Sequence, residues 1–291
     1  MKNTLNITGK IDAVTISVLA TFDQVAKSLG VPYLLVGATA RDMVLHHGYG
    51  IKNERATVDI DMAIQVQDWS MFHAVRSELL LVGYQPGKEK QRLYSPDEMP
   101  IDIVPFGGVE DPAMHIAWPP EDDWVMNMMG FTEAHSQAQH VIIQEEPFLS
   151  VPIAMPAGIA LLKLVAWTDR VVEKRKKDAQ DFFYVLSHYE SMPEINIRCY
   201  SDAEILEQYG GDIELVGAHY LGIDTAAIAK PATYQHITAL LTGKMTKKQL
   251  NVDRLVRESL SPYTELEFNQ RSVMVEAFRN GFCNANTTAH P

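Results

Sequence analysis

Thr57-Val58-Asp59-Ile60-Asp61-Met62-Ala63-Ile64 is an apolar stretch with two carboxylates set into it, and its pattern is that of a strand. Side chains alternate between the two faces of a strand, so Asp59 and Asp61 lie on the same face. Aspartate is disfavoured in strands and costly to bury without a partner. Two such carboxylates side by side need a counter-charge, and a divalent cation is the simplest one.

A third acid, Asp102, stands in similar surroundings in Pro100-Ile101-Asp102-Ile103-Val104. If the two strands are neighbours, three carboxylates converge on one site, and their hard oxygen ligands suit Mg²⁺ better than zinc. We therefore expect Asp59, Asp61 and Asp102 to be metal ligands and catalytic residues. The alternative is that they are solvated acids at the edge of a sheet.

A candidate phosphate site precedes these acids, in Leu35-Val36-Gly37-Ala38-Thr39-Ala40-Arg41-Asp42. A strand breaks there at Gly37 and opens directly into a helix, and free backbone N–H groups at such a turn can hold phosphate. The alternative is that Gly37 only meets the geometry of the turn.

Apolar periodicity predicts helices and strands in alternation up to about residue 110, then further strands, then mainly helices. The predicted helices are 11–29, 38–47, 69–82, 156–172, 178–188, 202–209, 234–241 and 265–279, and the predicted strands are 33–36, 58–66, 92–94, 101–106, 141–144 and 151–154. The prolines and polar residues of the stretch 111–140 indicate loops and an edge hairpin there. This order indicates an α+β protein, with a mixed sheet and flanking helices in residues 1–155 and a mostly helical portion in residues 156–291.

The composition is that of a soluble globular chain of about two domains, with 291 residues, 46% hydrophobic and 21% charged. No apolar run approaches the ~18 residues of a membrane span, and only two cysteines are present, so we expect a cytoplasmic protein with no membrane partner. The net charge of −12 opposes general adhesion to nucleic acid. The local exceptions are a basic cluster at 170–177 and a second one at 244–248, which we interpret as a solvated helix end.

The glycine turn and the three acids resemble the nucleotidyltransferase superfold shared with DNA polymerase beta and nucleotide-adding enzymes. Its pattern is an apolar residue, Gly, then Gly or Ser, a helix, Asp-x-Asp and a later third Asp, which this chain matches at Gly37, Asp59, Asp61 and Asp102. The gap from Gly37 to Asp59 is long for the pattern.

By this resemblance we expect nucleotide contacts at Gly37, Ala38, Thr39 and Arg41. Ala38 departs from the pattern, since it replaces the usual Gly or Ser and removes one hydroxyl contact to phosphate. Thr39 is the candidate to supply that hydroxyl.

The segments 156–170 and 175–186 resemble the AbiEii-type nucleotidyltransferases, toxins of type IV toxin–antitoxin systems. That family has a helix with an inward Lys, an Arg shortly after it, and a helix starting Lys-Asp-x-x-Asp. The match spans roughly residues 31 to 188. It implies that Lys163 contacts the triphosphate, that Asp178 belongs to the nucleotide site, and that the helical portion contributes to the active-site cleft.

Purely structural roles are also open to these side chains. Lys163, placed among leucines and valines, could form a buried ion pair with an Asp. Asp178 and Asp181 could be first-turn acids that stabilise a helix dipole.

The sequence therefore predicts an enzyme that moves an NMP from an NTP onto a hydroxyl by a two-metal mechanism, using two Mg²⁺ ions, with Mn²⁺ as an alternative. In this mechanism Asp59 and Asp61 bridge the ions and Asp102 assists at the second. The acceptor would be an RNA end, such as that of tRNA, or a protein side chain, and the resemblance implies a toxin with a cognate antitoxin. The rival is a non-catalytic or partner-activated nucleotide-binding protein on the same scaffold.

Overall fold

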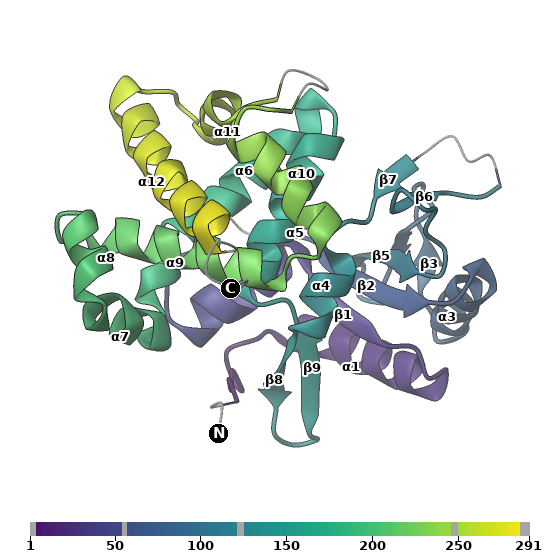
Figure 1. Ribbon diagram of the computed structural model, residues 1–291. Coiled ribbons are helices and arrows are strands. Elements are labelled where there is room, and N and C mark those ends of the chain that lie inside the picture. Colours follow the sequence, from purple (N-terminus) through teal and green to yellow (C-terminus); the bar gives the residue numbers. More distant parts are fainter. Residues whose placement is uncertain (1–3, 54–56, 121–124, 246–249, 286–291) are drawn as a thin grey trace. The chain divides into compact units, whose positions relative to one another are not determined.

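The computed structural model describes residues 4–53, 57–120, 125–245 and 250–285, and the chain divides into two compact units, Met1–Met155 and Pro156–Pro291 (Figure 1). The first unit contains a mixed sheet with flanking helices and the second is helical. The predicted α+β class is confirmed. None of the described helices is long and apolar enough to cross a bilayer.

The first unit is built on a seven-stranded sheet in the order β3-β4-β5-β2-β1-β9-β8. Its strands are β1 (Tyr33–Val36), β2 (Ile60–Val66), β3 (Gln85–Pro86), β4 (Arg92–Tyr94), β5 (Pro100–Gly107), β8 (Gln139–Gln144) and β9 (Leu149–Ile153). The pairs β2–β5 and β1–β9 are parallel, and the other neighbours are antiparallel. Central β1 is buried along its whole length, which matches its uninterrupted apolar sequence.

Helices α1 (Ala13–Ser28) and α3 (Trp69–Leu81) pack against each other and against the sheet (Figure 1). Asp12 caps α1 by accepting a hydrogen bond from the Thr15 amide at 2.9 Å, and Val18, Leu19 and Phe22 on one face of the helix are buried. The helix thus follows its predicted apolar stripe closely.

The helix expected over 38–47 is instead α2 (Gly37–Arg41) followed by the π-helix η1 (Asp42–Gly48). The wider turn of a π-helix leaves no mark in the apolar pattern, so the sequence could not indicate it.

The expected hairpin within 111–140 is present as β6 (His115–Ala117) and β7 (Val125–Asn127), and a short helix, α4 (Phe131–Ser136), follows it. The acidic segment 121–123 and Trp124 lie outside the described residues.

In its described residues, 156–245 and 250–285, the second unit consists of helices α5 to α12 and one 3₁₀ turn. Their bounds are α5 (Pro156–Asp169), α6 (Val172–Leu186), η2 (Tyr189–Ser191), α7 (Pro193–Ser201), α8 (Ala203–Gln208), α9 (Ile213–Ile228), α10 (Pro231–Leu241), α11 (Val252–Ser259) and α12 (Glu265–Asn284). Helices α9 and α12 lie in close contact, because a Cβ on Gly222 would come within 2.1 Å of the Phe278 carbonyl oxygen and one on Gly281 within 1.9 Å of the His219 carbonyl oxygen. The backbones of α9 and α12 are therefore in direct contact at these two glycines.

Helices α7, α9 and α11 were not predicted. Helix α9 is apolar on most sides and therefore shows no clear polar stripe.

The break between α5 and α6 also differs from the prediction. Helix α5 ends at Asp169, Val171 is extended (φ −69°, ψ 158°), and α6 begins at Val172, six residues before Asp178. Asp178 and Asp181 are consequently inside a helix, so their assignment as first-turn acids is wrong.

Candidate active site

Main-chain pairing aligns the predicted acids. In the parallel ladder between β2 and β5, Asp61 is the register partner of Asp102. Asp59 directly precedes β2 and lies on the same face as Asp61. One carboxylate oxygen from each of the three residues lies within 4.8 Å of the others. The structure therefore brings Asp59, Asp61 and Asp102 together, and we call them the acid cluster.

The acid cluster fits a divalent cation. Its ligand atoms are carboxylate oxygens, which Mg²⁺ and Mn²⁺ prefer, and its members are partly exposed, so water can complete the coordination. The side chain of Asp59 is 40% exposed and that of Asp102 is 15% exposed.

Arg92, which no sequence pattern singled out, contributes the counter-charge in this structure. Its Nε and Nη2 donate to Asp102 Oδ1 and Oδ2 at 2.8 and 2.7 Å, and Nη2 also donates to Asp59 Oδ2 at 3.1 Å. Arg92 and Asp102 are direct partners in the antiparallel ladder between β4 and β5. The hydrogen bonds to Asp102 raise the pKa of the guanidinium, which is charged throughout the accessible pH range.

Gly37 lies against the acid cluster. Its φ is +72°, a region that favours glycine, and a Cβ at this position would come within 1.9 Å of Asp61 Oδ2. Both the backbone conformation and the close approach of Asp61 therefore require glycine here.

The remaining residues of the predicted phosphate turn have varied surroundings. Ala38 is partly exposed, whereas Thr39 is buried and its Oγ1 donates to the Asp59 carbonyl oxygen at 2.7 Å. Arg41 is 3% exposed, and its Nε and Nη2 both donate to Asp42 Oδ1, at 2.8 and 2.6 Å. Thr39 thus anchors the start of Asp59's strand, and Arg41 is held by a buried carboxylate.

A cavity of about 310 Å³ adjoins Asp59 within the first unit. Its walls come from the residues that begin α1, from α2 and η1, and from residues 57–60, with Met99 at one side. Asp42 lies in the wall and holds Asn53 and Thr57, since its Oδ2 accepts hydrogen bonds from Asn53 Nδ2 at 2.9 Å and from Thr57 Oγ1 at 2.5 Å. The volume is near the lower end of the ~300–1,000 Å³ typical of small-molecule pockets.

Lys163 and Asp178 belong to the second unit. Lys163 Nζ lies 2.7 Å from Asp181 Oδ2 and 3.3 Å from Asp178 Oδ1, and Arg170 Nη1 lies 2.9 Å from Asp178 Oδ2. Burial disfavours the charged ammonium and by itself would lower the pKa of Lys163. The neighbouring carboxylates of Asp181 and Asp178 raise the pKa by more, so it lies above its usual value. The buried ion pair that the sequence left open for Lys163 is therefore present, and its partners are two acids, Asp178 and Asp181.

The basic cluster at 170–177 is not a uniform surface. Arg175 is 2% exposed, and its Nε and Nη2 donate to Glu258 of α11 at 2.8 and 2.7 Å. Lys174, Lys176 and Lys177 are exposed. Three lysines of this cluster are therefore accessible to a ligand, while Arg175 is a buried partner of Glu258.

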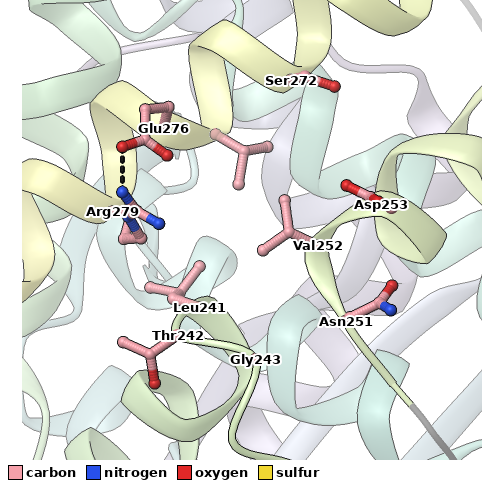
Figure 2. A pocket seen from close by; sticks show the side chains of 10 residues that line it. Leu241, Thr242, Gly243, Asn251, Val252, Asp253, Ser272, Glu276 and Arg279 are labelled. Atoms are coloured by element: carbon pink, nitrogen blue, oxygen red, sulfur yellow. Dashed lines mark hydrogen bonds and ion pairs between the residues drawn. The ribbon is translucent and has the colours of Figure 1, made fainter.

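A second cavity, of about 340 Å³, lies in the second unit between the end of α10, the start of α11, and α12 (Figure 2). Glu276 and Arg279 form an ion pair on its α12 side, and Asn251 and Asp253 lie on the α11 side. Its acidic side chains, Asp253 and Glu276, belong to no group of three possible metal ligands among the residues that the structure describes, so this cavity has no counterpart of the acid cluster.

No protein-family model matches the sequence, and no curated protein matches it at a significant level. Solved structures of two kinds, an antibiotic-resistance factor and CCA-adding enzymes, match the chain with low identity and low TM-scores. The antibiotic-resistance factor ANT(2'')-Ia has 12% identity and a TM-score of 0.35, over 68% of this chain and 98% of that one. The Thermotoga maritima CCA-adding enzyme in complex with tRNA has 11% identity and a TM-score of 0.26, over 96% of this chain and 83% of that one. A CCA-adding enzyme in complex with ATP has 10% identity and a TM-score of 0.25, over 95% and 72%.

Proposed function

We propose that the protein transfers a nucleotidyl group from an NTP to a hydroxyl acceptor at the acid cluster. The observation that supports this most directly is the alignment of three carboxylates by the β2–β5 ladder, with oxygens within 4.8 Å, beside a helix that begins at Gly37.

Asp59, Asp61 and Asp102 would hold two Mg²⁺ ions, or Mn²⁺, which would supply positive charge to the triphosphate and lower the pKa of the attacking hydroxyl. The chain's own residues set the geometry. Gly37 leaves room for the Asp61 carboxylate, and Thr39 fixes the backbone of Asp59. The amides at the start of α2, next to Asp61, would orient the phosphates.

The cavity beside Asp59 is the place we assign to a small group of the nucleotide or the acceptor. It shares Asp59 with the acid cluster, so a group bound there would be next to the reacting atoms. Arg41 and Thr39 would act by holding the cavity and the strand in place, since both side chains already have partners.

A finer proposal is that the chain is an AbiEii-type toxin with a cognate antitoxin, acting on an RNA end or a protein side chain. It rests on the sequence of segments 156–170 and 175–186. The exposed lysines at 174, 176 and 177 support an RNA acceptor, because they provide a local positive surface on an acidic protein.

The deciding experiment is incubation with each α-labelled NTP, Mg²⁺ and a total cell extract, followed by separation of labelled RNA from labelled protein. We expect one class of macromolecule to be labelled with one preferred NTP, and no labelling by Asp61→Asn. Asp253→Asn, which neutralises an exposed acid in the second unit, is the matched control and should label normally. NTP binding without labelling of any acceptor would contradict transfer and favour the nucleotide-binding rival.

A further inference from the structure

The guanidinium of Arg92 occupies the oxygens that a divalent cation would use. It donates to both oxygens of Asp102 and to one of Asp59, so two of the three members of the acid cluster already have a positive charge on them. A cation bound by the same carboxylates would lie within a few ångströms of this guanidinium, and like charges at that distance repel strongly.

The contacts of Arg92 also allow the side chain to leave. Its side chain is 24% exposed, and the Asp59 side chain to which it donates is 40% exposed. The backbone is held separately: the Arg92 amide donates to the Glu89 carbonyl oxygen, and the Gly87 amide donates to the Arg92 carbonyl oxygen, each at 3.0 Å. Rotation of the side chain alone would therefore free the carboxylates without disturbing the β3–β4 hairpin.

We propose that Arg92 is an internal competitor for the divalent cation at the acid cluster: its guanidinium neutralises the acids in the metal-free protein, and a cation must displace it. Arg92 then sets the cation affinity and stabilises the metal-free acids. This inference rests on the acid cluster being a metal site, which is one part of the proposed function, and it does not depend on nucleotidyl transfer.

The test is the affinity for Mn²⁺, measured by calorimetric titration of the full chain at fixed ionic strength and without nucleotide. We expect Arg92→Gln to bind Mn²⁺ about tenfold more tightly than the wild type or better, because it removes both the competitor and its charge. Arg92→Lys keeps the charge and should stay within about threefold of the wild type. Arg198→Gln is the matched control, since Arg198 Nη1 donates to both oxygens of Asp224 in the second unit, at 2.8 and 2.9 Å, and its loss should leave the Mn²⁺ affinity unchanged.

A second variant perturbs Arg92 while keeping every charge. A Cβ on Gly87 would come within 2.9 Å of Arg92 Cβ and 2.7 Å of its Cγ, so Gly87→Ala should shift the arginine stem. We expect its Mn²⁺ affinity to fall between those of the wild type and Arg92→Gln. This variant also serves as the test if Arg92→Gln does not fold without metal.

Thermal unfolding gives an independent readout. Without metal, Arg92→Gln should melt at a lower temperature than the wild type, because the acids lose their counter-charge, and Mn²⁺ should raise its melting temperature by more. Equal or weaker Mn²⁺ binding by Arg92→Gln and Gly87→Ala would overturn the proposal, as would the absence of Mn²⁺ binding by every variant. Since no nucleotide is present, these results are separate from a failure to transfer nucleotide: an active enzyme with unchanged Mn²⁺ affinity in Arg92→Gln would refute only the role of Arg92.

Discussion

The Asp61 carboxylate fills the space that a side chain at position 37 would need, since a Cβ on Gly37 would lie 1.9 Å from Asp61 Oδ2. The turn that opens α2 and the second acid of the acid cluster are therefore fitted to each other. A change at Gly37 must move either the turn or the carboxylate.

Gly37→Ala should lower stability and also weaken the site. The positive φ alone costs about 1–3 kcal/mol for a residue with a Cβ, and the contact with Asp61 adds to that cost. Gly30→Ala is the matched control, because Gly30 has a φ of +64° and nothing within 4 Å of its Cβ position. Urea unfolding should show both variants destabilised, whereas Mn²⁺ titration should show weakened binding only for Gly37→Ala. Equal Mn²⁺ affinity in the two alanine variants would contradict the fit between Gly37 and Asp61.

Asp61→Asn should abolish Mg²⁺-dependent labelling while leaving metal-free stability unchanged or higher. Neutralising one member of the acid cluster removes like-charge repulsion and keeps the shape of the side chain. Labelling assays and thermal unfolding in EDTA measure the two effects. Near-normal labelling of the acceptor by this variant would contradict the two-metal proposal.

Lys163→Met should destabilise the second unit by about 3–5 kcal/mol, because it removes the ammonium from two acids that are 1% and 2% exposed. Lys27→Met is the control, since Lys27 is 71% exposed in its pair with Asp23 and should cost at most about 1 kcal/mol. Equilibrium unfolding in urea compares them. Weaker NTP binding by Lys163→Met with little loss of stability would instead support the triphosphate role that the family resemblance implies.

The stability that Lys163 provides should persist into alkaline solution. A lysine whose pKa is raised on folding contributes fully below the unfolded value, near 10.5, and the contribution is lost as the pH rises through the folded value. The difference in unfolding free energy between the wild type and Lys163→Met should therefore be constant from pH 7 to about 10 and decrease only above that range. A decrease between pH 7 and 9 would be inconsistent with the raised pKa of Lys163.

Replacing Lys174, Lys176 and Lys177 together by Ala should flatten the salt dependence of RNA binding if the acceptor is RNA. Each phosphate contact that is lost reduces the slope of log K against log salt by about 0.7–0.9. The fold should remain intact, because all three side chains are exposed. Arg175 must be left in place, since it is buried on Glu258. An unchanged slope in filter-binding assays would move the RNA contact elsewhere or favour a protein acceptor.

The acid cluster could be predicted from the sequence because strand alternation has a fixed period. Alternation places Asp59 and Asp61 on one face of their strand. The cluster is then complete if the strand that carries Asp102 is its neighbour, and the parallel β2–β5 ladder makes it so. Arg92 was missed, although one signal was present. Pro96 and Asp97 lie in the turn between β4 and β5, and counting outwards from Asp97 pairs Arg92 with Asp102.

The second unit was predicted less well, because its boundaries depend on tertiary contacts. The break at Arg170 and Val171 has no Gly or Pro to mark it, and the helical pattern runs through it. Arg175 lies in a basic run that looks solvated, and only its pairing with Glu258, more than eighty residues later, explains its burial.

The parallel ladder between β2 and β5 has a consequence for how such a protein can change over generations. The alternation of apolar and polar positions along the two strands, and not the identity of each apolar residue, sets Asp61 opposite Asp102, so Met62 and Ile103 can be exchanged for other apolar residues of similar volume without moving the acids. Only a slip of the register would separate them. A lineage can therefore rewrite most of this sheet and still inherit the same arrangement of carboxylates, and a designer could rebuild the core around it in the same way.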